Sequence, residues 1–299
     1  MLVDEEALTK VEWRVCDIKN RDGLQVILEG IDVVIHCAGV ISFWPDEYKQ
    51  MFEVNHHATE HLVSLAQEAE VSRFIHLSSV EALGKENEKN VLITESTTFD
   101  VDSALSQYAI SKYRGELSVK RSKLETVVYY PGFVLGAGDW TVGPLQIFKD
   151  IYKGLSIYAS GTIGIVDVRD LAAVIVDHLM DEKMSNDTYI VVSENISHKS
   201  LFKKIAVNLG RKPPSIALSK GLALIAIGYE RIKAGFTGGK PLINREMYDI
   251  ASTTLRYDNQ KIKNVTGYEF RTLDETIREV CVAFLKSYPD GRKFGRLYN

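Results

Sequence analysis

The sequence predicts an α/β fold with a mostly parallel sheet, because helical and strand patterns alternate along the chain from near its start. Two stretches carry this prediction. The uninterrupted apolar run at 31–39 (IDVVIHCAG) is typical of a strand that is buried on both faces of a parallel sheet. Residues 46–70 then place apolar side chains at three- and four-residue steps, which indicates a long helix.

The other elements follow from their own local patterns. Alternating apolar and polar residues predict a first strand at 11–16, and residues 21–30 have the period of a helix. SRFIHLSS (72–79) predicts a strand that ends in two serines. The later expected elements are, in order, a polar loop (85–102), a helix (103–120), a strand (126–138), a helix (144–153), a strand (162–168), a helix from Arg169 and a strand (188–193).

Composition and charge exclude several classes of protein. With 45% hydrophobic and 25% charged residues, the chain of 299 residues has the composition of a soluble globular protein. A net charge of −4 argues against nucleic acid as a partner, because that surface needs clustered Lys and Arg. Three cysteines without CxxC spacing support neither a disulfide framework nor a thiolate zinc site. We therefore expect a cytoplasmic protein.

No stable membrane insertion is expected. The sequence has no signal peptide and no run of 18 apolar residues. The nearest approach is 218–236 (LSKGLALIAIGYERIKAGF), where charged residues bracket a short apolar stretch. We interpret it as a core or pocket-lining helix, with an interfacial membrane helix as the alternative.

The strongest local signal is YAISK, in which Tyr108 and Lys112 lie four residues apart. On a helix these side chains share one face, so the ammonium can sit near the phenol. A neighbouring positive charge favours the phenolate and would lower the pKa of Tyr108 toward working pH, as an acid/base catalyst requires. An isolated YxxxK also occurs on ordinary amphipathic helices, so its neighbours decide its meaning.

Those neighbours are strand ends. One predicted strand ends in Ser78 and Ser79, and YYPGFVLGAGD (129–139) supplies another end with a Pro-Gly turn. Ligands of parallel α/β sheets bind at the carboxyl ends of the strands. We therefore expect these segments to converge with YAISK.

An ordered set of motifs resembles the extended short-chain dehydrogenase/reductases, also described as NAD-dependent epimerase/dehydratases. The similarity is dense over residues 10–175 and looser beyond. SSVEALG and the later 242–264 stretch resemble the branch of 3β-hydroxysteroid dehydrogenases and dihydroflavonol-4-reductase-like enzymes. The matching segments are CDIKNRDGL (16–24), DVVIHCAG (32–39), residues 54–84, YAISKYRGE (108–116), YYPGFVLGAGD (129–139) and IVDVRDLAAVI (165–175).

The resemblance implies a Rossmann-like doubly wound sheet that binds NAD or NADP within residues 1–160. A smaller substrate-binding unit would occupy 161–299, interleaved with the last sheet strands. Tyr108 would be the acid/base, Lys112 would lower its pKa and bind the nicotinamide ribose, and Ser79 would hold the substrate oxygen, with Ser78 as second choice. Besides Ser78, Tyr108 and Lys112, the implied cofactor-binding residues are Asp17, Ile18, Cys37, Ala38, Gly39, Pro131, Gly132, Phe133 and Val134.

In this family a glycine-rich loop holds the cofactor's pyrophosphate, but the sequence has no such loop before residues 11–16, and its other glycine clusters do not replace it. We therefore expect an N-terminally shortened enzyme that lacks the first βαβ unit, with an unpaired edge on the strand at 32–37. The discriminator between NAD and NADP would also lie in that unit.

Three functions stay open from the sequence. The first is a hydride transfer to or from an alcohol or ketone carbon of a small, fairly apolar substrate of 3β-hydroxysteroid or dihydroflavonol type. The second is a nucleotide-sugar epimerase or dehydratase, which the leucines Leu83 and Leu135 disfavour because sugar-nucleotide enzymes often carry tyrosines there. The third is a non-catalytic relative that binds a ligand or partner. A homodimer is compatible with each.

No metal site is expected. The histidines His36 and His76 fall in predicted strands, and His57 and His61 share a helix face. We see no carboxylate or cysteine that completes a ligand set with them.

Overall fold

The computed structural model describes residue 6 and residues 9–85, 92–141, 143–237, 241 and 243–288. Its main sheet has four strands, all parallel, which confirms the predicted fold class. They are, in spatial order, β1 (Val33–His36), β2 (Arg73–Leu77), β3 (Glu125–Pro131) and β7 (Asp187–Val191).

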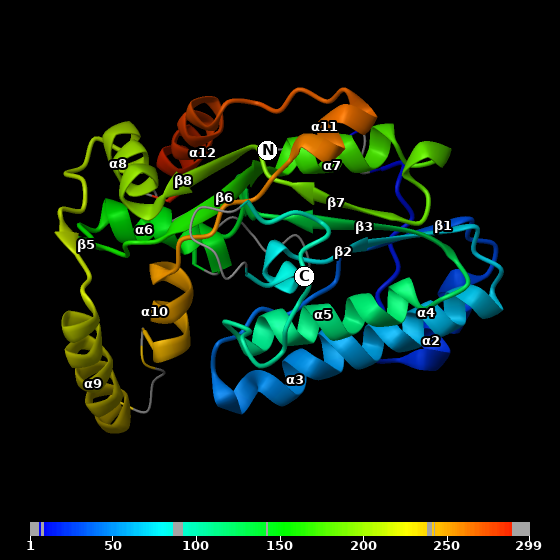
Figure 1. Ribbon diagram of the computed structural model, residues 1–299, viewed down its shortest axis with the longest axis horizontal. Coiled ribbons are helices and arrows are strands. Elements are labelled where there is room, and N and C mark those ends of the chain that lie inside the picture. Colours follow the sequence, from blue (N-terminus) through cyan, green and yellow to red (C-terminus); the bar gives the residue numbers. More distant parts are fainter. Residues whose placement is uncertain are drawn as a thin grey trace.

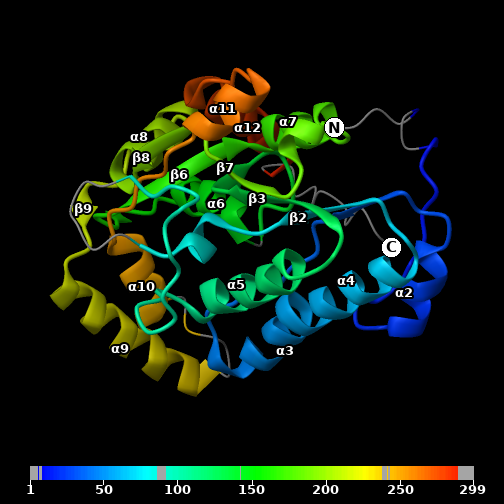
Figure 2. The same ribbon diagram turned by 45° about the vertical axis from the view of Figure 1, so that its right-hand side comes forward.

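Helices cover both faces of this sheet (Figures 1 and 2). One face carries α2 (Arg21–Leu28), α3 (Tyr48–Phe52), α4 (Thr59–Glu68) and α5 (Gln107–Lys120), and the other carries α7 (Val168–Asp177) and α11 (Gln260–Thr266). Successive residues of a central strand enter opposite cores, since Phe74 packs with the first set of helices and Ile75 with the second. The central strands are therefore buried on both faces.

The predicted long helix at 46–70 is continuous but not uniform. It consists of η1 (Pro45–Glu47), α3, a π-helical turn η2 (Glu53–Ala58) and α4. The widened turn carries Asn55, and α5 crosses close to it at Gly115. A Cβ on Gly115 would lie only 2.1 Å from the Asn55 carbonyl oxygen, so the crossing requires glycine.

The first predicted strand is wrong, because residues 11–17 contain no strand. A strand needs a neighbour for its backbone groups, and here the apolar side chains face solvent instead: Trp13 is 58% exposed and Val15 fully exposed. β1 forms one edge of the sheet, as expected for this strand. Its predicted burial on both faces fails, since Ile35 is 41% exposed.

The predicted strand at 126–138 is divided between two sheets. β3 stays in the main sheet, whereas β4 (Phe133–Leu135) joins β6 (Thr162–Asp167) and β8 (Glu194–Ser197). The chain crosses over at Gly132, where a Cβ would lie 2.4 Å from the Gly164 carbonyl oxygen.

A second core packs around this smaller sheet. Its helices are α6 (Gln146–Tyr152), α8 (His198–Asn208) and α12 (Leu273–Ser287). A third sheet pairs β5 (Ile157–Tyr158) with β9 (Ile216–Ala217), and α9 (Lys220–Thr237) and α10 (Arg245–Ser252) follow it. Short 3-10 turns are η3 (Val80–Leu83), η4 (Gly143–Leu145) and η5 (Glu182–Met184).

Two expectations on organisation are not settled. The polar loop at 85–102 falls partly outside the described residues, at 86–91. The division near residue 160 stays a prediction, although β7 returns to the main sheet from beyond it. Within the described part of the chain, no helix is long and apolar enough to cross a membrane.

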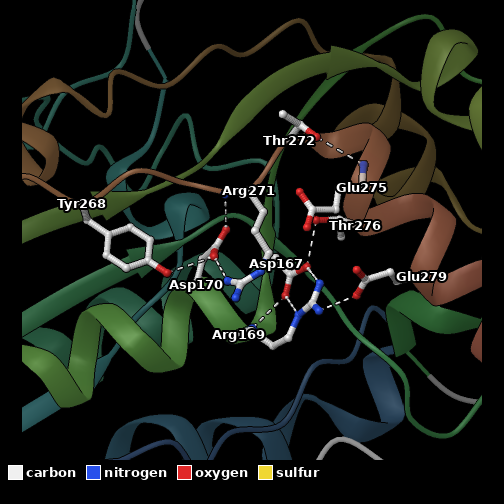
Figure 3. A network of polar contacts seen from close by, with 9 residues as sticks. All are labelled: Asp167, Arg169, Asp170, Tyr268, Arg271, Thr272, Glu275, Thr276 and Glu279. Carbon is white, nitrogen blue, oxygen red and sulfur yellow. Dashed lines mark hydrogen bonds and ion pairs between the residues drawn. The ribbon is translucent and has the colours of Figure 1, made fainter.

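A polar network joins the start of α7 to the C-terminal segment (Figure 3). Asp167 caps α7 through the Arg169 amide (2.8 Å) and accepts a hydrogen bond from Thr276 of α12 (2.8 Å). The buried Asp170 accepts hydrogen bonds from the Tyr268 hydroxyl (3.0 Å) and the backbone amide of Arg271 (2.9 Å), whose guanidinium also pairs with it. Charge-assisted bonds of this kind fix the C-terminal helices on the sheet.

Candidate active site

The ends of β2 and the first turn of α5 bring Ser79 and Tyr108 together. Ser79 lies two residues beyond the end of β2 and caps η3, since its hydroxyl accepts from the Glu81 amide (3.2 Å). α5 begins at Gln107 rather than 103 because Ser106 caps it, accepting from the Ala109 amide (2.9 Å). This start buries Tyr108, whose phenol lies near enough to Ser79 for that side chain to lower its pKa.

The charge relation between Tyr108 and Lys112 differs from the prediction. Burial and the nearby Glu81 carboxylate raise the pKa of Tyr108, and the hydrogen bond with Ser79 offsets only part of this. The Lys112 ammonium instead donates to the Leu77 carbonyl oxygen at the end of β2 (2.6 Å). The expected lowering of the Tyr108 pKa by Lys112 is therefore wrong for this structure.

Lys112 is 4% exposed, and its surroundings set its charge. Burial lowers its pKa to about 8, while the Glu116 carboxylate and Cys37 counteract that change. Burial and the Lys112 charge also lower the pKa of two histidines, that of His36 to about 3 and that of His76 well below its ordinary value. A buried ammonium thus lies among neutral imidazoles.

Glu116 occupies the next turn of α5 and is 2% exposed. Its carboxylate accepts hydrogen bonds from the Ser78 hydroxyl (2.7 Å) and the Tyr130 hydroxyl (2.6 Å), and it pairs with the Lys120 ammonium (2.7 Å). The Ser78 hydroxyl is therefore engaged by the buried Glu116, which leaves Ser79 as the serine available to a substrate. The sequence offered a signal for Glu116, because it continues the four-residue spacing from Lys112.

Two further carboxylates, Glu81 and Glu246, lie near the start of α5. Burial raises the pKa of Glu81 to about 7, partly offset by a hydrogen bond from Ser106 (2.8 Å), and the charge of Glu246 raises it further. Glu246 itself accepts from the Gln107 amide (2.8 Å) and the Tyr48 hydroxyl (2.5 Å). Neither role was foreseen, since 165 residues separate the two acids in sequence.

A cavity of about 320 Å³ opens at this end of α5. It lies where the N-terminus of α5 faces α10. Its lining residues are Ala104, Leu105, Ser106, Gln107, Arg245, Glu246 and Asp249.

The segment after β1 approaches Lys112 as expected. A Cβ on Gly39 would lie 3.8 Å from the Lys112 nitrogen and 3.4 Å from the Asn55 carboxamide oxygen. Asn55 fixes this segment, because its side chain bonds both the amide (2.7 Å) and the carbonyl (2.8 Å) of Val40. The adjoining Cys37 and Ala38 are exposed at the same strand end.

The remaining predicted cofactor residues divide into two groups. Pro131 ends β3 two residues beyond Tyr129, whose carbonyl oxygen accepts from the Ser78 amide (2.8 Å). The following Gly132 leads into β4, where Phe133 and Val134 pair with β6 of the smaller sheet. Asp17 binds the Lys19 amide in its own turn (2.9 Å). Ile18 packs on the core that contains Leu24 and Leu28.

One histidine cluster differs from expectation. Potential ligand atoms of His56, His57 and Glu60 lie within 4.8 Å of one another, so a carboxylate does accompany two histidines. All three belong to the π-helical turn and the start of α4, and His57 and Glu60 are exposed. The expectation of no metal site stays a prediction.

Comparisons with known proteins place this geometry in context. A family model described as the NAD dependent epimerase/dehydratase family matches residues 3–183. A putative dihydroflavonol 4-reductase of Synechocystis is 22% identical over 282 residues, covering 90% of this chain and 80% of the relative. The sterol demethylase protein B of Methylococcus capsulatus is 24% identical over 267 residues, with coverages of 86% and 80%.

Solved structures share the fold. The crystal structure of gox2253 superimposes with a TM-score of 0.78 at 26% identity, covering 95% of this chain and 88% of that chain. The Bordetella bronchiseptica enzyme WbmG, in complex with NAD and UDP, has a TM-score of 0.70 at 17% identity, with coverages of 91% and 79%.

Proposed function

Because this chain belongs to the NAD-dependent epimerase/dehydratase family, we propose that it is an NAD(P)-dependent oxidoreductase acting on an alcohol or ketone carbon of a small, fairly apolar substrate. The observation that carries this proposal is the meeting of Ser79, Tyr108 and the Lys112 helix turn at one strand end. A hydroxyl next to a buried phenol is suited to hold a substrate oxygen while a proton moves.

The residues around Lys112 fit the nicotinamide half of the cofactor. Gly39 has no side chain next to the Lys112 ammonium and Asn55, so a flat ring and its ribose could approach the backbone there. Lys112 would bind the ribose, and the strand end at Cys37 and Ala38 would line the cofactor. Among the described residues, no glycine-rich loop at a helix N-terminus is placed to hold the pyrophosphate.

NAD, when bound, supplies hydride transfer at its nicotinamide ring. The protein's own residues manage the accompanying proton. Ser79 would orient the substrate oxygen, and Tyr108 would give a proton to it or take one from it. A phenol whose pKa is raised by burial keeps its proton, so Tyr108 is protonated in this arrangement.

The apolar substrate class is supported by the relatives named as dihydroflavonol reductase and sterol demethylase protein. The two leucines that argued from the sequence against a sugar-nucleotide enzyme lie in the hydrophobic core: Leu83 is 3% exposed and Leu135 is fully buried. They can shape the site only through packing.

The second candidate is a nucleotide-sugar epimerase or dehydratase, and Glu81 favours it. Removing water from a sugar needs an acid/base group besides the phenol. Glu81 lies near Tyr108, and a carboxyl with a pKa of about 7 can exchange protons at neutral pH. WbmG, which shares the fold, was solved with UDP.

Turnover of three substrate classes tests the proposal. A 3-hydroxysteroid with NAD+ or NADP+, a dihydroflavonol with NADPH, and UDP-glucose with NAD+ are each followed with the wild type, Tyr108→Phe and Tyr113→Phe. Tyr108→Phe should reduce kcat by ~10²- to 10⁴-fold because the proton donor is gone. Tyr113→Phe is the matched control, since Tyr113 lies on the same helix but stacks on Phe99.

Other results would redirect the assignment. Equal turnover by Tyr108→Phe and wild type would refute the role of the phenol. Turnover of UDP-glucose alone would favour the second candidate. Fluorescence titration that detects neither NADH nor NADPH binding, either by this chain or by a version extended with a glycine-rich βαβ unit, would favour a non-catalytic relative.

A further inference from the structure

The outward face of α9 is apolar. Four side chains at three- and four-residue steps form a row along it, and they are 48% to 70% exposed: Leu222, Ile225, Tyr229 and Ile232. Leu224, which precedes Ile225 and lies next to this row on the helix surface, is 54% exposed. These five residues are called the α9 face below.

The opposite side of α9 already holds the helix on the protein. Ala223 is fully buried and Ile227 is 6% exposed. α9 lies at the outer edge of the molecule beside α10 in both views (Figures 1 and 2). The interpretation of 218–236 as a core helix is therefore wrong for this face, because the helix buries one stripe and leaves another uncovered.

Basic residues are concentrated in the segment that contains and precedes α9. Between residues 211 and 235 the chain carries five basic side chains and one acidic side chain, although its net charge is −4. All five are exposed: Arg211, Lys212, Lys220, Arg231 and Lys233. Helical geometry places Arg231 and Lys233 on the two sides of Ile232.

The one acidic residue, Glu230, offsets only one of these five positive charges. Glu230 is partly buried and pairs with Lys233 (3.3 Å), which stays 46% exposed. This segment thus combines an exposed apolar row with a net positive charge in a protein whose net charge is −4.

We propose that the α9 face docks on an anionic lipid bilayer, with the apolar row in the interface and the basic side chains against lipid phosphates. A helix of this kind lies in the plane of the interface, because apolar burial and attraction to anionic headgroups act together. A second copy of the same face is disfavoured, since it would bring basic side chains against basic side chains. The proposal does not depend on the reaction.

Vesicle co-sedimentation of the whole protein tests this docking. Vesicles of phosphatidylcholine alone are compared with vesicles that also contain phosphatidylglycerol. We expect binding only to the second kind, weakened at high salt because the Lys and Arg contacts are screened. Ile225→Glu should reduce binding at least about tenfold, since it puts a charge into the apolar row.

Val176→Glu is the matched control, because Val176 is 62% exposed on α7 and lies outside the α9 face. It should bind vesicles like the wild type, and circular dichroism should show both variants folded. Absence of binding to either vesicle, or equal binding to both, would overturn the proposal. So would light scattering that shows a wild-type dimer and an Ile225→Glu monomer, because a second copy would then cover the face.

Discussion

Helices α5 and α9 both depart from the usual pattern of burial: α5 buries polar and charged side chains, whereas α9 exposes apolar ones. α5 buries a hydroxyl, an ammonium and a carboxylate, with Ser111, Lys112 and Glu116 at most 4% exposed. α9 exposes Ile225 and Ile232 by 70% and 64%. The buried groups of α5 find partners inside the protein, whereas the α9 face has an apolar surface turned to solvent. Both departures from ordinary patterning coincide with the regions to which we assign function.

The largest effect on stability is expected where α5 buries its acid. Glu116→Leu removes the acceptor for Ser78 and Tyr130 and leaves the Lys120 pair broken. We expect the free energy of unfolding to fall by about 3–5 kcal/mol, because two buried hydroxyl donors lose their acceptor at ~1–3 kcal/mol each. Urea unfolding measures it. A loss below ~1 kcal/mol would mean that the donors find new partners.

Glycine substitutions on the two helices should have opposite signs. Gly115→Ala places a Cβ 2.1 Å from the Asn55 carbonyl oxygen, and we expect a loss of about 3 kcal/mol, at the upper end for overpacking. Gly228→Ala on α9 meets no atom within 4 Å and should add about 0.5–1 kcal/mol through helix propensity. Thermal unfolding compares the two. A stabilising Gly115→Ala would contradict the close crossing.

A smaller, pH-dependent effect is expected at Lys112. Its pKa is about 8 in the folded protein against an ordinary value of 10.5, so the unfolded chain binds more protons between these values. Wild-type stability should therefore rise with pH across this window, because the fold no longer holds a buried ammonium. Below pH 8 the destabilisation is complete.

Lys112→Met removes that ammonium and also the bond to Leu77. We expect the variant to be about 2 kcal/mol more stable than wild type at pH 7, with the difference narrowing between pH 8 and 10.5. Urea unfolding at pH 7 and pH 10 checks this. A variant less stable at pH 7 would show that the Leu77 bond outweighs the desolvation of the charge.

Much of α5 could be predicted from the sequence, because its signals are local. The four-residue spacing put Tyr108 and Lys112 on one helix, and the strand end placed Ser79 near them. What the lysine binds could not be predicted, since it depends on which carbonyl the fold presents. The same holds for Glu246, whose partners Tyr48 and Gln107 are distant in sequence.

Two errors have one physical cause. The alternation at 11–16 and the periodicity of 218–236 each define an apolar face, but neither states what covers it. In the structure Val15 and Ile225 both face solvent. The division of the strand at Gly132 was missed for a related reason, because the contact with Gly164 comes from a separate sheet.

The carboxylate of Glu246 joins the C-terminal part of the chain to the first turn of α5. It caps that turn through Gln107 while Tyr48 holds it from the other side. A chimaera that grafts the C-terminal part of a relative onto this protein would therefore have to bring its own acid to that position. Without one, exchanging the C-terminal part would also disturb the first turn of α5, which carries Tyr108.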